Sequence, residues 1–147
     1  MEIKILTNTH EKWESVATFA ENCSWRAGKY LANLMRINSF KDWERVFAAF
    51  DGDDPMGFCT LTEKDELDPK YPYSPLIGFV FVDESFRGRR ISEKMIHKAI
   101  EYSRSIGYNK IYVMSSEKGL YEKYGFVYIG DYENIYNEKE QLFMLGI

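Results

Sequence analysis

Hydrophobic and polar residues follow two different periods along the chain, and the clearest change of period lies in its middle third. Leu76–Val82 is a short apolar run rich in β-branched and aromatic residues, which is typical of a buried strand. Asp83–Arg90 is polar and charged, which indicates a loop. Ile91–Ile106 repeats its apolar residues at the spacing of one helical face, and Gly107 supplies a stop signal. This stretch therefore predicts a strand that leads into a helix through a loop containing glycine and arginine.

The same two periods predict the remaining elements. Strands are predicted over Glu2–Thr7, Trp43–Phe50, Met56–Thr62, Asn109–Met114, Phe126–Ile129 and Gln141–Gly146, and helices over Glu11–Glu21, Trp25–Arg36 and Lys118–Lys123. A strong turn signal at Asp51–Pro55 indicates that the strands before and after it form a hairpin. Glu63–Tyr73 is a long polar connection, and loops of such length are often functional.

The order of these elements predicts the fold class. We expect an α/β (α+β) fold with one mixed, mostly antiparallel sheet and helices on both faces. Leu76–Val82, the following helix and Asn109–Met114 form a βαβ unit, so these two strands should be parallel. Because no repeat or linker divides the 147 residues, we expect a single domain over residues 1–147.

Composition and charge narrow the possible partners. The formal charge is −4, which argues against nucleic acid, and the one basic cluster is Arg87, Arg89 and Arg90. No apolar run is long enough to span a membrane, and the first residues show no signal-peptide pattern. Cys23 and Cys59 lack metal-ligand spacing, and we interpret them as free thiols of a reducing compartment. We therefore expect a cytoplasmic protein with no metal, no membrane partner and no nucleic-acid partner.

The arginine loop is the first candidate site. A loop that leads into a helix leaves backbone N–H groups pointing out of the helix start, and arginines add positive potential there. Phosphate groups are natural ligands of such a place. The alternative is a solvated surface loop without a ligand.

Two motifs extend this interpretation. The residues VDESFRGRRIS precede the long helix, and GLYEKYGF follows about thirty residues later. Together they resemble the motifs of the GNAT superfamily of N-acetyltransferases. Arg87 fits the phosphate-binding signature of that family. Arg90 stands where the family usually has glycine, and Ser92 where it has glycine or alanine. The Arg90 N–H can still donate if its φ is negative.

The resemblance implies a GNAT-like acyl-CoA N-acyltransferase fold with acetyl-CoA as co-substrate. It implies that the pyrophosphate binds at Arg87, Gly88, Arg89, Arg90, Ile91 and Ser92. The pantetheine arm would then bind along Phe81 and Val82, with the Val82 N–H aimed at the thioester carbonyl, and Ser116 would take the place of an asparagine. Tyr121 would donate a proton to the leaving thiolate, whereas Tyr124 holds a packing position.

The implied activity is transfer of an acetyl group to a primary amine of a small molecule or peptide. One alternative is a catalytically inactive acyl-CoA-binding sensor of the same fold, and another is a nucleotide- or nucleic-acid-binding protein. Tyr121 could also be a core tyrosine. The oligomeric state stays open, with a homodimer as one form. No pattern identifies a general base, and the candidate carboxylates are Glu63, Asp65, Glu66, Asp83 and Glu84. An acidic loop near the cleft would favour a cationic amine.

Overall fold

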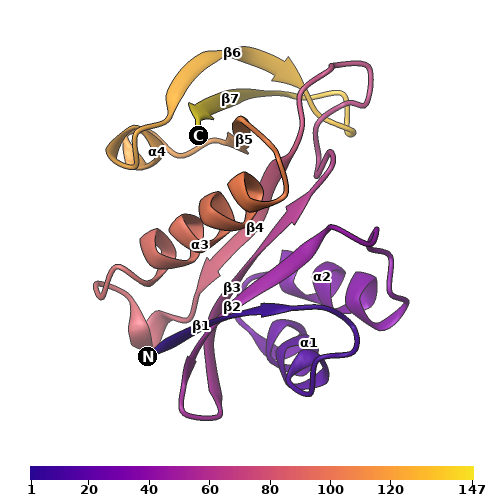
Figure 1. The fold of residues 1–147 in the computed structure, drawn as a ribbon, viewed down its shortest axis with the longest axis vertical. Coiled ribbons are helices and arrows are strands. Elements are labelled where there is room, and N and C mark those ends of the chain that lie inside the picture. Colours follow the sequence, from indigo (N-terminus) through magenta and orange to yellow (C-terminus); the bar gives the residue numbers. More distant parts are fainter.

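The computed structural model describes residues 1–147, and its strands form one sheet of seven (Figure 1). The strands are β1 (Glu2–Leu6), β2 (Arg45–Asp51), β3 (Asp54–Thr62), β4 (Leu76–Val82), β5 (Lys110–Ser115), β6 (Val127–Glu133) and β7 (Lys139–Gly146). The helices are α1 (Trp13–Asn22), α2 (Ala27–Arg36), α3 (Ile91–Ser105) and α4 (Leu120–Lys123), with a 3₁₀ turn at Glu84–Phe86. The sheet order is β1-β2-β3-β4-β5-β7-β6, and β4 and β5 are its one parallel pair. The predicted mixed, mostly antiparallel sheet is confirmed.

Helices cover both faces of the sheet, as predicted. α1 and α2 lie on one side and α3 on the other (Figure 1). Alternation along β2 produces the two cores, because Val46, Ala48 and Phe50 pack with α1 and α2 while Phe47 and Ala49 pack with α3. No helix combines the length and apolar character needed to cross a lipid bilayer.

β6 is the element whose extent was predicted incorrectly. The sequence predicted a strand over Phe126–Ile129, whereas β6 continues to Glu133 and forms the edge of the sheet. Val127 and Tyr128 are exposed, and the register with β7 shifts between Tyr128 and Gly130. An exposed, bulged edge strand lacks regular alternation of hydrophobic and polar residues, so the pattern revealed only its start.

β4 and β5 separate soon after they pair. Their ladder joins Leu76 to Tyr112 and Ile77 to Val113 and then ends, although β4 continues to Val82. The register of β4 with β3 also shifts here, and Phe79 has a φ of 50°. A residue in this left-handed conformation bends a strand away from its neighbour. The edge of β4 that faces β5 is therefore left without a strand partner beyond Ile77.

Candidate active site

A cavity of about 660 Å³ opens where β4 and β5 separate. Its walls include β4 from Ile77 to Val82, the chain from Val113 to Glu117, and the first residues of α4. Six of the residues predicted for the site line this cavity: Phe81, Val82, Arg87, Ser92, Ser116 and Tyr121. Gly88, Arg89 and Arg90 lie outside it on the exposed loop before α3, and Ile91 is buried beneath that loop.

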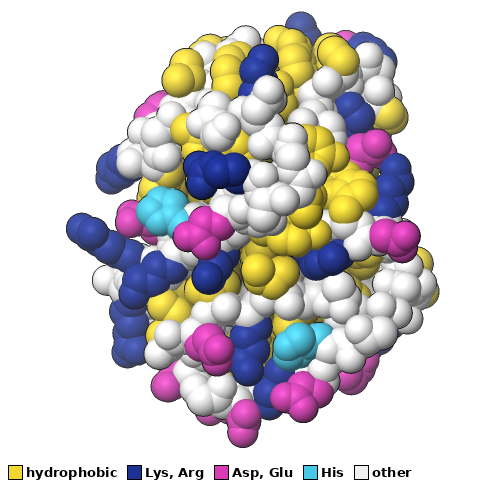
Figure 2. Space-filling view, in the orientation of Figure 1, with side chains coloured by type: hydrophobic (Ala, Val, Ile, Leu, Met, Phe, Trp, Pro, Cys, Tyr) yellow, Lys and Arg dark blue, Asp and Glu magenta, His cyan; other side chains and the backbone are white.

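The start of α3 presents a row of unused hydrogen-bond donors. The backbone N–H groups from Gly88 to Glu93 donate to no acceptor in the protein, and the first α3 bond runs from the Lys94 N–H to the Arg90 carbonyl. Lys and Arg side chains gather over this end of α3 (Figure 2). Six consecutive free N–H groups at a helix start, next to cationic side chains, form an environment that favours an anion.

Arg90 corrects one expectation about this loop. Its φ is 59°, so the negative φ assumed for its backbone does not occur. The chain uses the left-handed conformation at this residue to turn into the helix, which accounts for the glycine usual at this motif position. The Arg90 N–H nevertheless remains without an acceptor in the protein.

Arg87 is held in place, unlike a side chain of a freely solvated loop. Its Nε donates to the Val82 carbonyl over 3.0 Å, and its guanidinium lies 5.8 Å from the centre of the Phe81 ring. Arg89 lies over the Phe86 ring at 5.5 Å and remains exposed. Arg87 therefore links the end of β4 to the loop and brings positive charge to the cavity wall.

The two tyrosines of the second motif have different environments. Tyr121 is 4% exposed, packs against Phe126 and Phe143, and lines the cavity. Burial raises the pKa of its hydroxyl well above the ordinary value, and that hydroxyl has no hydrogen-bond partner in the protein. It therefore stays protonated and free to donate. Tyr124 also packs on this core, but its hydroxyl lies 3.2 Å from the Ser92 hydroxyl, a contact that the motif did not predict.

The five candidate carboxylates have different environments in the structure. Glu63 forms an ion pair with Lys41, and Asp83 and Glu84 accept hydrogen bonds from Ser85 and Ser24. The other two candidates, Asp65 and Glu66, line the cavity.

Among the carboxyl groups that line the cavity, Asp65 has the pKa that is raised most. Burial, followed by the charge of Glu66, raises the pKa of Asp65 to about 7. Burial and the charges of Glu140 and Glu138 also raise the pKa of Glu66. A Cβ at Gly78 would lie 2.1 Å from Asp65 Oδ1, so only glycine leaves room for this carboxylate.

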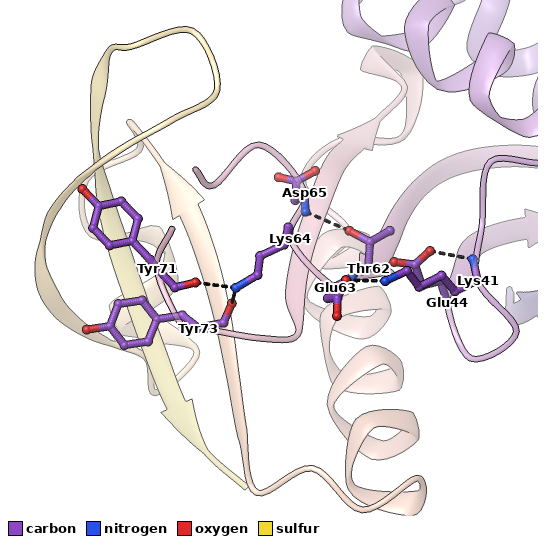
Figure 3. Close-up of polar contacts among 8 residues, drawn as sticks. All are labelled: Lys41, Glu44, Thr62, Glu63, Lys64, Asp65, Tyr71 and Tyr73. Atoms are coloured by element: carbon purple, nitrogen blue, oxygen red, sulfur yellow. Dashed lines mark hydrogen bonds and ion pairs between the residues drawn. The ribbon is translucent and has the colours of Figure 1, made fainter. Parts of the chain in front are cut away.

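Hydrogen bonds fix the chain before Asp65 (Figure 3). The Glu44 carboxylate accepts from the backbone N–H groups of Lys41 and Glu63, each over 2.7 Å. The Asp65 N–H donates to the Thr62 hydroxyl over 3.1 Å. Glu44 is 8% exposed, and its two partners offset the cost of burying its charge.

A lysine fixes the chain after Asp65. Lys64 Nζ donates to the backbone carbonyls of Tyr71 and Tyr73, so it closes the long connection on itself (Figure 3). The Ile135 N–H donates to the Glu66 carbonyl, which joins this connection to the turn between β6 and β7. The carboxylate pair Asp65–Glu66 thus lies on a loop that is held from both ends.

Comparisons with known proteins agree with this arrangement. The chain matches the model of the acetyltransferase (GNAT) family over residues 8–126. No curated protein matches its sequence.

Solved structures match the whole fold. A crystal structure of an aminoglycoside 6'-N-acetyltransferase complexed with coenzyme A shows a TM-score of 0.73 at 15% identity, covering 99% of this chain and 97% of that chain. An aminoglycoside 6'-acetyltransferase type Ii shows 0.76 at 17% identity, with coverage of 99% and 97%. A spermidine N-acetyltransferase mutant from Vibrio cholerae shows 0.66 at 18% identity, with coverage of 99% and 95%. At these identities the likeness shows the fold.

Proposed function

Because the chain belongs to the acetyltransferase (GNAT) family, we propose that it transfers an acetyl group from acetyl-CoA to a primary amine of a small molecule or peptide. The observation that carries this proposal is the row of free N–H groups from Gly88 to Glu93 beside a cavity between two separated strands. The two features match the two parts of coenzyme A, which are a charged pyrophosphate and an uncharged, amide-containing arm.

The cofactor would bind along the start of α3 and the free edge of β4. The N–H groups of the loop would hold the pyrophosphate, and Arg87, Arg89 and Arg90 would add positive charge around it. The pantetheine amides would pair with the β4 edge at Phe81 and Val82, as an added strand would. The Val82 N–H remains our candidate donor to the thioester carbonyl, and Ser116 lies on the opposite wall.

Asp65 and Tyr121 supply proton acceptor and donor in the same cavity. Asp65, with a pKa of about 7, would take a proton from the incoming ammonium, because a base works best when its pKa lies near the operating pH. The amine nitrogen then attacks the thioester carbonyl, the carbon–sulfur bond breaks, and the thiolate takes the proton of the Tyr121 hydroxyl. The acylated nitrogen loses its second proton, which restores the Tyr121 hydroxyl through water, and Asp65 releases its own proton to the solvent.

Binding and turnover together test the proposal. Acetyl-CoA should raise the melting temperature, while pantetheine, which lacks the pyrophosphate, should bind much more weakly. Gly88→Asp should weaken acetyl-CoA binding through backbone restriction and charge, since Gly88 has a φ of 85°. Thiol release with a panel of amines then measures transfer. Equal binding of both ligands contradicts the phosphate role of the loop, and tight acetyl-CoA binding without any thiol release favours the inactive sensor.

A further inference from the structure

A second cavity of about 530 Å³ adjoins the first on the face covered by α1 and α2. Three residues line both cavities: Asp65, Glu66 and Phe79. The carboxylate pair Asp65–Glu66 therefore lies where the two cavities meet. A molecule in the second cavity would reach this pair from the side opposite to α3.

Most charges of the second cavity are neutralised within the protein. Six charged residues line it, and four of them have partners. Lys41 pairs with Glu63, Glu44 accepts two backbone N–H groups, and Lys64 donates to two carbonyls (Figure 3).

The carboxylates of Asp65 and Glu66 have neither an ion-pair partner nor a side-chain hydrogen bond. The charge left for a ligand is thus negative and confined to the junction of the cavities. One ammonium group satisfies such a site, whereas a long polycation finds no further free anion along the walls of the second cavity.

The remaining walls are apolar and largely aromatic. Tyr30 from α2 stacks on Phe79 with ring centres 6.0 Å apart and an angle of 22°. Leu34 and Phe40 extend this wall, and Ile135 closes it from the turn between β6 and β7. Tyr30 is 51% exposed and Ile135 47%, so both present apolar surface at the rim of the cavity. A ligand with an apolar body would cover both.

One buried hydroxyl completes the site. Thr60 lines the second cavity and is 1% exposed, yet its Oγ1 has no hydrogen-bond partner. A buried polar atom without a partner is unfavourable, so a bound molecule with a polar group at this position would gain a hydrogen bond.

We propose that the second cavity binds the acceptor, and that the acceptor is a monoamine with an aromatic or similarly flat apolar body and a polar substituent. Its ammonium lies at Asp65 and Glu66, its body lies against Tyr30 and Phe79, and its substituent bonds to Thr60. This inference rests on the proposed acetyl transfer and specifies the amine that receives the group.

The experiment compares kcat/KM at saturating acetyl-CoA for tyramine, phenethylamine, spermidine and kanamycin. We expect the two aromatic monoamines to exceed both polycations by about tenfold or more, and tyramine to exceed phenethylamine because it carries a hydroxyl. Thr60→Val should remove the preference for tyramine over phenethylamine. Preference for spermidine or kanamycin would overturn the inference and leave the acetyl transfer standing.

Two tyrosine variants test the aromatic wall. Tyr30→Ala should raise KM for tyramine about tenfold with little change in kcat, because a binding contact equal in ground and transition states is lost. Tyr128→Ala is the matched control, since Tyr128 is 48% exposed on β6 and lines neither cavity. Equal effects of the two variants would contradict the site.

Calorimetry keeps the inference testable without turnover. Tyramine should bind the protein–coenzyme A complex more tightly than spermidine does. If tyramine binds in this way but no amine is acetylated, the acceptor site stands and the proposed transfer fails. If spermidine binds more tightly, the acceptor site as described here is wrong.

Discussion

Replacing Asp65 with asparagine should make the protein more stable at pH 8 while it removes the proposed base. The pKa of Asp65 rises from an ordinary 3.8 to about 7, mainly through burial. This is a change of about 3 units, and each unit corresponds to about 1.4 kcal/mol. Ionising Asp65 in the folded protein therefore costs about 4 kcal/mol, and water that enters the cavity and hydrates the carboxylate lowers this cost.

The sign of the effect fixes the pH window. Because the folded pKa lies above the unfolded one, the protonated carboxyl favours folding below pH 3.8, and this contribution is lost as the pH rises through about 7. Asparagine carries no proton to lose. The difference in unfolding free energy, variant minus wild type, should therefore rise by at most about 1.4 kcal/mol per pH unit between these limits and then level off.

Urea unfolding across this pH range measures the difference directly. Asp42→Asn is the control, since Asp42 is exposed and lines neither cavity. The same Asp65→Asn protein should lose about 10²- to 10⁴-fold in kcat, as expected when a general base is removed. A difference in stability that does not change with pH would refute the burial of this charge. Unchanged kcat would remove Asp65 from the mechanism.

Three further substitutions test the neighbouring features. Tyr121→Phe should lower kcat by about 10²- to 10³-fold with little change in acetyl-CoA affinity, whereas Tyr124→Phe should affect kcat much less; equal losses in steady-state assays would remove Tyr121 as the donor. Arg90→Gly should raise the unfolding free energy by up to about 1 kcal/mol. The left-handed conformation costs arginine about 1–2 kcal/mol, and about half of the gain is offset by the larger conformational entropy that glycine loses on folding. Lower stability of the variant in urea would contradict this. Gly78→Ala should destabilise the fold by about 1–3 kcal/mol and lower kcat, because the new Cβ would lie 2.1 Å from the cavity aspartate. Gly146→Ala, which meets nothing within 4 Å, should change neither stability nor kcat.

The sequence predicted the central strand and the helix that follows it. Leu76–Val82 has the observed bounds of β4, and α3 begins at Ile91 as expected. Both are buried on a regular face, so their periodicity reports their structure. The predicted extent of β6 was too short. An edge strand exposes residues such as Val127, so its hydrophobic and polar residues do not need to alternate.

Local sequence contained less information about the site. The two motifs pointed to Arg87 and Tyr121, which line one cavity although 34 positions (121 minus 87) separate them. The sequence could not show which of the five candidate carboxylates is buried in the cavity with a raised pKa. The position of Asp65 depends on the close approach of Gly78 from a strand. The φ of Arg90 depends on how the loop turns into α3. Such properties arise from contacts between distant segments rather than from residue type.

The short ladder between β4 and β5 has a mechanical consequence. Only two residue pairs join the four-stranded half of the sheet, β1 to β4, to the three-stranded half that β5, β7 and β6 form. A rotation of one half against the other would also strain the isolated bridge between Leu67 and Asn134. The core under α3 takes buried residues from both halves, among them Ile77 and Val113, so side-chain packing sets the width of the gap where strand pairing does not.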